Sequence, residues 1–211
     1  CVGRPVPPNQ VRIIAIDDAP IAHWSAVVEL PAGEVGEITA AGPTTTDSYF
    51  NREAATIAAK IVEVRADGGE QVVHRMGDVG YFDAEGRLWF CGRKTQRVQA
   101  ADRALYTEQV EPVFNAHPQV RRTALVGVGV PGAQRPVLCV ELAAGVDAGQ
   151  FQRIQGELRT LAAAHAHTAP VATFLRHPGF PVDIRHNAKI GREKLAAWAG
   201  AALSAGSGGA A

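Results

Sequence analysis

Residues 74–94, with the sequence HRMGDVGYFDAEGRLWFCGRK, constrain the fold of this chain more than any other stretch. Two apolar arms, 79–82 and 88–91, flank the turn-forming sequence Asp-Ala-Glu-Gly, a pattern that predicts a β-hairpin. Asp78 and Arg93 stand at the outer ends of the arms, and pairing of the arms would bring them close together. A carboxylate that accepts hydrogen bonds from vicinal hydroxyls, beside a forked guanidinium that reaches a phosphate, suits a ribose phosphate.

A second string, PVDIRHNAKIGREKL, occupies residues 181–195. It places Lys189 in a loop that follows Pro181 and precedes a helical pattern. Each of these signals has a plainer alternative. Asp78 and Arg93 are also typical of a solvated turn and a surface ion pair, which stabilises a fold little. Lys189 is equally consistent with a solvated basic face at the start of a helix.

The composition is that of ordinary globular material, with 46% hydrophobic and 20% charged residues. The 21 basic residues balance the 21 acidic ones, so charge gives no reason to expect nucleic acid or an anionic membrane as a partner. We expect no transmembrane segment, because no apolar run reaches the length of a membrane span. The three cysteines are widely separated, which favours reduced thiols in the cytoplasm. Neither they nor His165 and His167 have the spacing of a metal site.

The pattern along the chain predicts a mixed α/β (α+β) fold. A β-rich part is expected at 1–93, a polar hinge at 94–102 and an α+β part at 103–200. Ser, Gly and Ala dominate residues 201–211, and we expect a disordered tail there.

Hydrophobic periodicity and turn residues place the individual elements. Strands are expected at 10–17, 36–43, 120–130, 137–142 and 171–175, and helices at 107–116, 148–165 and 192–199. Thr107 is expected to cap the first of these helices. The run 123–128 is almost continuously apolar, which indicates a strand covered on both faces.

Taken together, the two strings resemble the late motifs of the acyl-adenylate-forming superfamily, which includes acyl-CoA synthetases, adenylation domains and luciferases. The family pattern GDxGYxDxxGxLxxxGR is similar to residues 77–93. The family's C-terminal proline and GKxxR are similar to residues 181–192, with Ala188 in place of the usual glycine. The resemblance covers nearly the whole chain, from Gly3 to Trp198.

The resemblance implies a domain organisation. Family members carry a larger N-terminal portion with a phosphate loop, and no such string occurs here. We therefore expect the last third of such an enzyme, inactive in isolation. Residues 1–93 would be a barrel-like β-rich subdomain, truncated at its N-terminal side, and 103–200 a mobile lid.

The resemblance also implies roles for particular residues. Asp78 would accept hydrogen bonds from the ribose hydroxyls of ATP and of the acyl-adenylate, and Arg93 would lie beside the ribose and phosphate. Lys189 would be the catalytic lysine of the lid, contacting the carboxylate and the α-phosphate during adenylation. Lys94 and Thr95 would lie at the hinge, where Thr95 replaces the usual Asp or Lys. ATP is implied as cosubstrate, with Mg²⁺ bound through its phosphates.

The region after the hinge resembles one branch of the superfamily. Residues 100–102, Ala-Ala-Asp, stand where most members have a glycine-rich turn. Together with the sequences VFNAHPQVRRTALVGV and FPVDIRHNAKIGREKLAAWA, this segment is similar in sequence to the β-lactone synthetases of bacterial olefin biosynthesis. Such enzymes adenylate a 2-alkyl-3-hydroxy fatty acid, whose own hydroxyl then displaces AMP.

The expected function is therefore activation of a long-chain or 3-hydroxy fatty acid as acyl-AMP, with other olefin-biosynthesis enzymes as candidate partners. One alternative is a long-chain fatty acid–CoA ligase, for which CoA would be a further substrate. An alternative of another class is a non-catalytic remnant or interaction module.

Overall fold

A computed structural model of the chain describes residues 1–183 and 186–207, apart from the side chains of 186–188 and 206–207. The chain divides into two compact units, Cys1–Thr95 and Gln96–Ala211. Within the described ranges, every helix is too short or too polar to cross a membrane.

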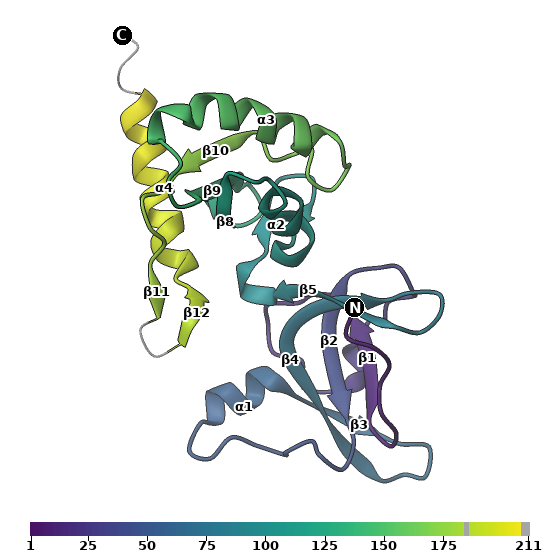
Figure 1. The fold of residues 1–211 in the computed structure, drawn as a ribbon. Coiled ribbons are helices and arrows are strands. Elements are labelled where there is room, and N and C mark those ends of the chain that lie inside the picture. The colour runs from purple at the N-terminus through teal and green to yellow at the C-terminus, as the bar shows by residue number, and fades with distance from the viewer. Residues whose placement is uncertain (184–185, 208–211) are drawn as a thin grey trace. The chain divides into compact units, whose positions relative to one another are not determined.

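The first unit is built on a five-stranded antiparallel sheet in the order β1-β2-β4-β3, with β5 also paired to β4 (Figure 1). Its elements are β1 (Gln10–Ile14), η1 (Trp24–Ala26), β2 (Gly36–Ala41), α1 (Glu53–Ala59), β3 (Lys60–Val64), β4 (Glu70–Phe82) and β5 (Leu88–Arg93), and η2 (Lys94–Gln96) crosses into the second unit. The β-rich character expected from the sequence is confirmed.

The expected barrel-like closure is absent from the described part of the first unit. The reason lies in β4, which pairs with β3 along its first half and with β5 along its second half. Both partners therefore occupy the same side of β4, while β2 and then β1 extend the other side. The two outer edges do not pair with each other, so the sheet stays open.

The predicted hairpin is confirmed, with its arms at the ends of β4 and the start of β5. Asp83 organises the turn between them, because its carboxylate accepts hydrogen bonds from the backbone N–H of Glu85 and Arg87 and from the Trp89 indole. Gly86 has φ +73°, a left-handed conformation that glycine adopts without strain. Burial acts to raise the pKa of Asp83, but these hydrogen bonds and the Arg87 guanidinium hold that pKa well below its usual range.

The second unit has a three-stranded sheet in the order β10-β9-β8, with β8 antiparallel and β10 parallel to β9. Its elements are β6 (Val98–Gln99), β7 (Ala104–Leu105), α2 (Thr107–Asn115), β8 (Val120–Val128), β9 (Arg135–Leu142), η3 (Ala148–Gln150), α3 (Phe151–Ala163), β10 (Thr173–Arg176), β11 (Val182–Asp183), β12 (His186–Ile190) and α4 (Arg192–Ser207). β6 pairs with β7, and β11 pairs with β12.

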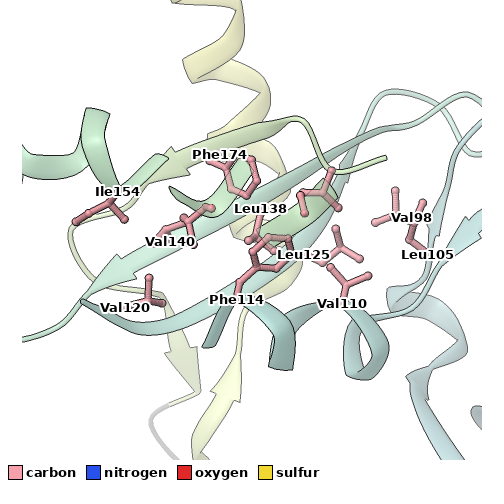
Figure 2. Close-up of a cluster of buried hydrophobic side chains, with 13 residues drawn as sticks. Val98, Leu105, Val110, Phe114, Val120, Leu125, Leu138, Val140, Ile154 and Phe174 are labelled. Carbon is pink, nitrogen blue, oxygen red and sulfur yellow. The ribbon is translucent and has the colours of Figure 1, made fainter. Parts of the chain in front are cut away.

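Buried side chains cover both faces of this sheet, as the apolar run at 123–128 predicts. On one face, Leu125 and residues of α2 and α3, such as Phe114 and Ile154, form the larger core cluster (Figure 2). On the other face, Val126 packs with Leu195 and further residues of α4. The alternation of neighbouring β8 residues between the two clusters follows from the two-residue period of a strand.

Two expectations about helix ends were wrong. Thr107 lies inside α2, and the residue before it, Tyr106, caps the helix without a side-chain hydrogen bond. Helix α4 continues to Ser207, so residues 201–207 are helical rather than a disordered tail. The rest of that predicted tail, 208–211, lies outside the described residues.

Candidate active site

Asp78 and Arg93 are directly opposite each other in the register of β4 and β5. Arg93 Nη1 lies 2.7 Å from Asp78 Oδ1, and the Asp78 side chain is 20% exposed whereas that of Arg93 is 59% exposed. The proximity expected from the hairpin is therefore confirmed. The arginine presents its remaining donors toward solvent beside a half-buried carboxylate.

The Asp78 carboxylate keeps unused capacity to accept hydrogen bonds. Its Oδ1 atom is buried, and within the described residues it forms an ion pair with Arg93 but accepts no hydrogen bond of good geometry. Burial raises the pKa of Asp78 above its ordinary value, and the Arg93 charge offsets this only in part. Because an unsatisfied buried acceptor is costly, a ligand that donates hydroxyl hydrogens would relieve that cost.

The local backbone geometry explains why glycines stand near Asp78. Gly77 has φ +68°, which turns the chain immediately before the aspartate. A Cβ atom on Gly80 would lie 2.4 Å from the Trp89 carbonyl oxygen, so only glycine lets β4 and β5 approach this closely. The register shifts between Val79 and Gly80, and this irregularity sets the alignment of the outer end of the hairpin.

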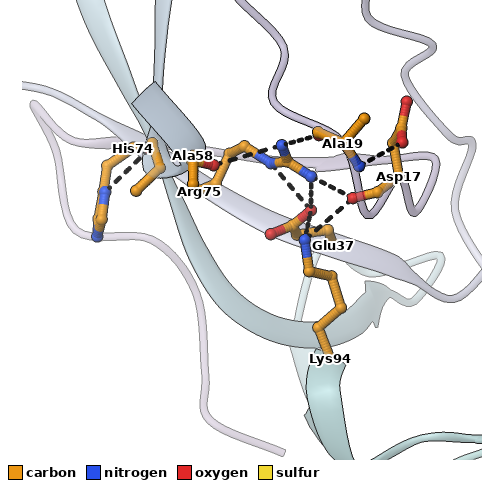
Figure 3. Close-up of polar contacts among 8 residues, drawn as sticks. Asp17, Ala19, Glu37, Ala58, His74, Arg75 and Lys94 are labelled. Atoms are coloured by element: carbon orange, nitrogen blue, oxygen red, sulfur yellow. Dashed lines mark hydrogen bonds and ion pairs between the residues drawn. The ribbon is translucent and has the colours of Figure 1, made fainter. Parts of the chain in front are cut away.

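A buried charge network that the sequence reasoning missed includes Lys94, the residue that follows Arg93 (Figure 3). Glu37 Oε2 accepts hydrogen bonds from Arg75 Nη2 at 2.7 Å and from Lys94 Nζ at 3.1 Å. Arg75 and Lys94 both also donate to the Asp17 carbonyl oxygen. Glu37 and Arg75 are 1% and 4% exposed, so their charges are largely withdrawn from water. The network therefore links Lys94, the residue that follows Arg93, to β2 and β4.

A pocket of about 480 Å³ lies against this network in the first unit. It is lined by Glu37, Tyr49, Arg52, Ala55, Ala58, Ala59, Arg75, Met76, Gly77 and Lys94. Because Gly77 and Lys94 immediately flank Asp78 and Arg93 in the sequence, the pocket opens next to the paired residues. Its three basic side chains against one carboxylate favour an anionic occupant.

Lys189 was expected in a loop, but it lies on strand β12 of the second unit, where it is exposed. It lines a pocket of about 510 Å³ together with Pro181, Val182, Asp183, Ile190, Gly191 and Lys194. The side chain of His186, a weaker candidate for orienting a substrate, lies outside the described residues.

The two hinge candidates, Lys94 and Thr95, belong to η2 at the end of the first unit. Their part in any domain movement stays a prediction. Among the described residues, no cluster of His, Cys, Asp and Glu has the composition of a metal site.

The chain has close relatives in two bacteria. The chain is 73% identical over 199 residues to an olefin beta-lactone synthetase of Xanthomonas campestris. The matched region covers 94% of this chain and 36% of the relative. It is 68% identical over 203 residues to an olefin beta-lactone synthetase of Stenotrophomonas maltophilia, with 96% and 36% covered. The chain thus spans about a third of the length of these relatives. No protein-family profile matches.

Solved structures with a similar fold include two synthetases. The amide bond synthetase McbA of Marinactinospora thermotolerans shares 28% identity and a TM-score of 0.68, over 93% of this chain and 36% of that one. The O-succinylbenzoate coenzyme A synthetase of Bacillus subtilis, solved with AMP, shares 26% identity and a TM-score of 0.64, over 92% and 34%.

Proposed function

Because this chain belongs to the acyl-adenylate-forming superfamily of AMP-dependent ligases, we propose that it supplies the ribose-binding carboxylate and the catalytic lysine of such an enzyme. The ligase would activate a fatty acid with ATP, releasing pyrophosphate. The observation that carries the proposal is the Asp78–Arg93 pair. Among the described residues, the buried Oδ1 atom of Asp78 accepts no hydrogen bond of good geometry, and the Arg93 guanidinium is 59% exposed.

Asp78 fits the sugar of a nucleotide. The two vicinal hydroxyls of a ribose can both donate to one carboxylate, which would satisfy the buried Oδ1 atom. Arg93, 59% exposed in the same hairpin, can then donate to the ribose or the α-phosphate. The pocket beside them, with its basic lining, supports an anionic ligand at this position.

Lys189 would act on the bond-making step. A carboxylate oxygen attacks the α-phosphorus of ATP, the bond to the β-phosphate bridging oxygen breaks, and pyrophosphate leaves. Two anions approach each other in this step, so an ammonium that contacts both stabilises the transition state more than the separate substrates. At an effective dielectric constant near 20, one such contact at 4 Å contributes about 4 kcal/mol. Mg²⁺ would accompany the ATP phosphates and supply further positive charge.

We favour β-lactone formation as the second half-reaction. The 3-hydroxyl oxygen of the substrate attacks its own acyl carbon, the bond to AMP breaks, and the hydroxyl proton is lost. An intramolecular nucleophile needs no second substrate, and its high effective concentration favours this route. The names of the two close relatives support this choice, as does the replacement of a glycine-rich turn by residues 100–102. Other olefin-forming enzymes would then receive the product.

One observation favours the thioester-forming alternative. More distant relatives, such as the 2-succinylbenzoate–CoA ligase of Bacillus cereus at 37% identity over 101 residues, are CoA ligases by name. Supplying the ligase with ATP, a 3-hydroxy fatty acid and CoA separates the two. A β-lactone formed without CoA supports the synthetase, and an acyl thioester that requires CoA supports the ligase.

A cytoplasmic site of action is part of the proposal. The reaction uses ATP, and Cys139 is buried as a free thiol, as in reducing compartments.

The Asp78→Asn variant of the complete ligase tests the nucleotide assignment. Hydrogen bonds to a charged acceptor contribute about 1.5–3 kcal/mol, so the KM for ATP should rise roughly ten- to a hundredfold. The matched control is Asp67→Asn, which removes an exposed aspartate paired with Arg65 in the same unit. Equal KM values for both variants would contradict the assignment. AMP titration of the 211-residue chain tests the non-catalytic alternative, because measurable affinity that Asp78→Asn abolishes supports a nucleotide half-site.

A further inference from the structure

We propose that the Glu111–Arg192 ion pair positions Lys189 for adenylation, by fixing the end of the β11–β12 hairpin on which the lysine lies. The inference rests on the proposed function, since it assigns a task to residues that serve the same lysine. Neither residue needs to contact a substrate, and we therefore regard them as positioning residues.

The pair joins three elements at the last residue of the lysine motif. Arg192, the first residue of α4, donates from Nη1 to Glu111 Oε1 at 2.5 Å and from Nη2 to Oε2 at 3.0 Å. Glu111 belongs to α2, and its Oε1 also accepts the backbone N–H of Leu125 in β8 at 2.8 Å. Arg192 Nη1 in turn donates to the Leu125 carbonyl oxygen at 3.2 Å. The fork of the arginine is thereby fixed in direction as well as in position.

Burial makes this contact rigid. The side chains of Arg192 and Glu111 are 14% and 9% exposed, so water does not compete strongly for either. Burial raises the pKa of Glu111, while the Arg192 charge and hydrogen bonds oppose that rise. Replacing a buried ion pair by apolar residues is often neutral for stability, so stability alone does not account for such a pair. A defined geometry at the base of the hairpin does account for it.

The chain that leads into β11, on the other side of the hairpin base, is held as well. Glu141 Oε2, in β9, accepts the backbone N–H of Phe180 at 3.0 Å, and Phe180 is buried between strand and helix residues. The Gly191 N–H donates to the Pro181 carbonyl oxygen at 2.7 Å, which closes the neck of the hairpin. Both strands therefore leave a fixed base.

Lys189 is three residues from the fixed Arg192, so at most about 10 Å of backbone separates the lysine from the contact. Ile190, between them, packs against the same cluster as Phe180 and Leu195. A shift of the base would therefore move the ammonium directly. Because a misplacement of about 1 Å can cost a hundredfold in rate, a loose base would lower the rate of chemistry rather than nucleotide affinity.

The test uses Arg192→Lys and Glu111→Gln in the complete ligase, assayed by carboxylate-dependent ATP–pyrophosphate exchange. Arg192→Lys keeps the charge but loses the fork, so it remains informative if Glu111→Gln fails to fold. We expect kcat to fall roughly ten- to a hundredfold while the KM for ATP changes less than about twofold. Ile154→Val is the stability control, since it loosens the larger core cluster, away from the hairpin. It should lower the melting temperature without lowering kcat.

A double-mutant cycle separates positioning from a merely structural role. If Arg192 acts through Lys189, then Arg192→Lys should cost no further activity in a Lys189→Ala background. Equal losses in both backgrounds, or no loss beside native Lys189, would overturn the inference while leaving the role of Lys189 intact. A Lys189→Ala variant with the normal rate would instead refute the proposed function, and the inference with it.

Discussion

At the scale of single residues, the site combines an arrangement that the sequence predicts with one that it does not. Asp78 and Arg93 belong to one hairpin, so a local pattern suffices to place them opposite each other. Glu37 and Arg75 are 38 positions apart and meet through strand pairing that no local pattern specifies. The available signal was a charged residue at the start of an apolar strand, which indicates a paired buried charge.

Protonation of Asp78 should weaken nucleotide binding. Burial raises the pKa of this carboxyl, and ribose hydroxyls donate to its ionised form. Affinity for AMP should thus be full above the raised pKa and decline as the pH falls through it. Titrations over a pH series should show this decline for the native ligase and not for Asp78→Asn, which binds weakly throughout. Parallel pH profiles for the two would argue against Asp78 as the titrating group.

The close approach of β4 and β5 makes Gly80 sensitive to substitution. Gly80→Ala places a methyl group 2.4 Å from a backbone oxygen that cannot move freely, so we expect a loss of about 1–3 kcal/mol in unfolding free energy. Gly156→Ala in α3 is the control, because nothing lies within 4 Å of its Cβ position. There alanine should stabilise by about 0.5–1 kcal/mol. Urea unfolding measures both, and equal effects would contradict the packing argument.

At the scale of elements, strong periodicity predicted most strands and helices, and the misses have physical causes. The tail at 201–207 was expected to be disordered from its Gly and Ser content. Alanine is the best helix former, however, and Leu203 packs against the α4 cluster, so the helix continues. The open sheet could not be predicted, because the side of β4 on which β5 pairs depends on long-range contacts.

The network that joins β2, β4 and η2 should stabilise the first unit. Glu37→Gln leaves the buried Arg75 guanidinium without its counter-charge, and we expect a loss of about 3–5 kcal/mol in unfolding free energy. Glu63→Gln is the matched control, since its pair with Arg12 is more exposed, at 14% and 21%. Its loss should be clearly smaller. Similar losses in urea unfolding would show that burial of the Glu37 pair has no special effect.

At the scale of the whole molecule, the proposed reaction divides its tasks between the two units. In this proposal the first unit would hold the nucleotide through Asp78 and Arg93, and the second would supply Lys189 from a hairpin with a fixed base. The sequence motifs suffice to propose these three residues, because each motif is local. The supporting pair Glu111–Arg192, 81 positions apart, required the fold.

The rate of carboxylate-dependent ATP–pyrophosphate exchange by the complete ligase, with Lys189→Ala beside Lys194→Ala, tests the central claim most directly. Both lysines line the same pocket, so the two variants remove the same charge at neighbouring positions. Loss of a contact of about 4 kcal/mol predicts a roughly thousandfold decrease for Lys189→Ala. Lys194→Ala should stay within about threefold of the native rate. A normal exchange rate for Lys189→Ala would contradict the account.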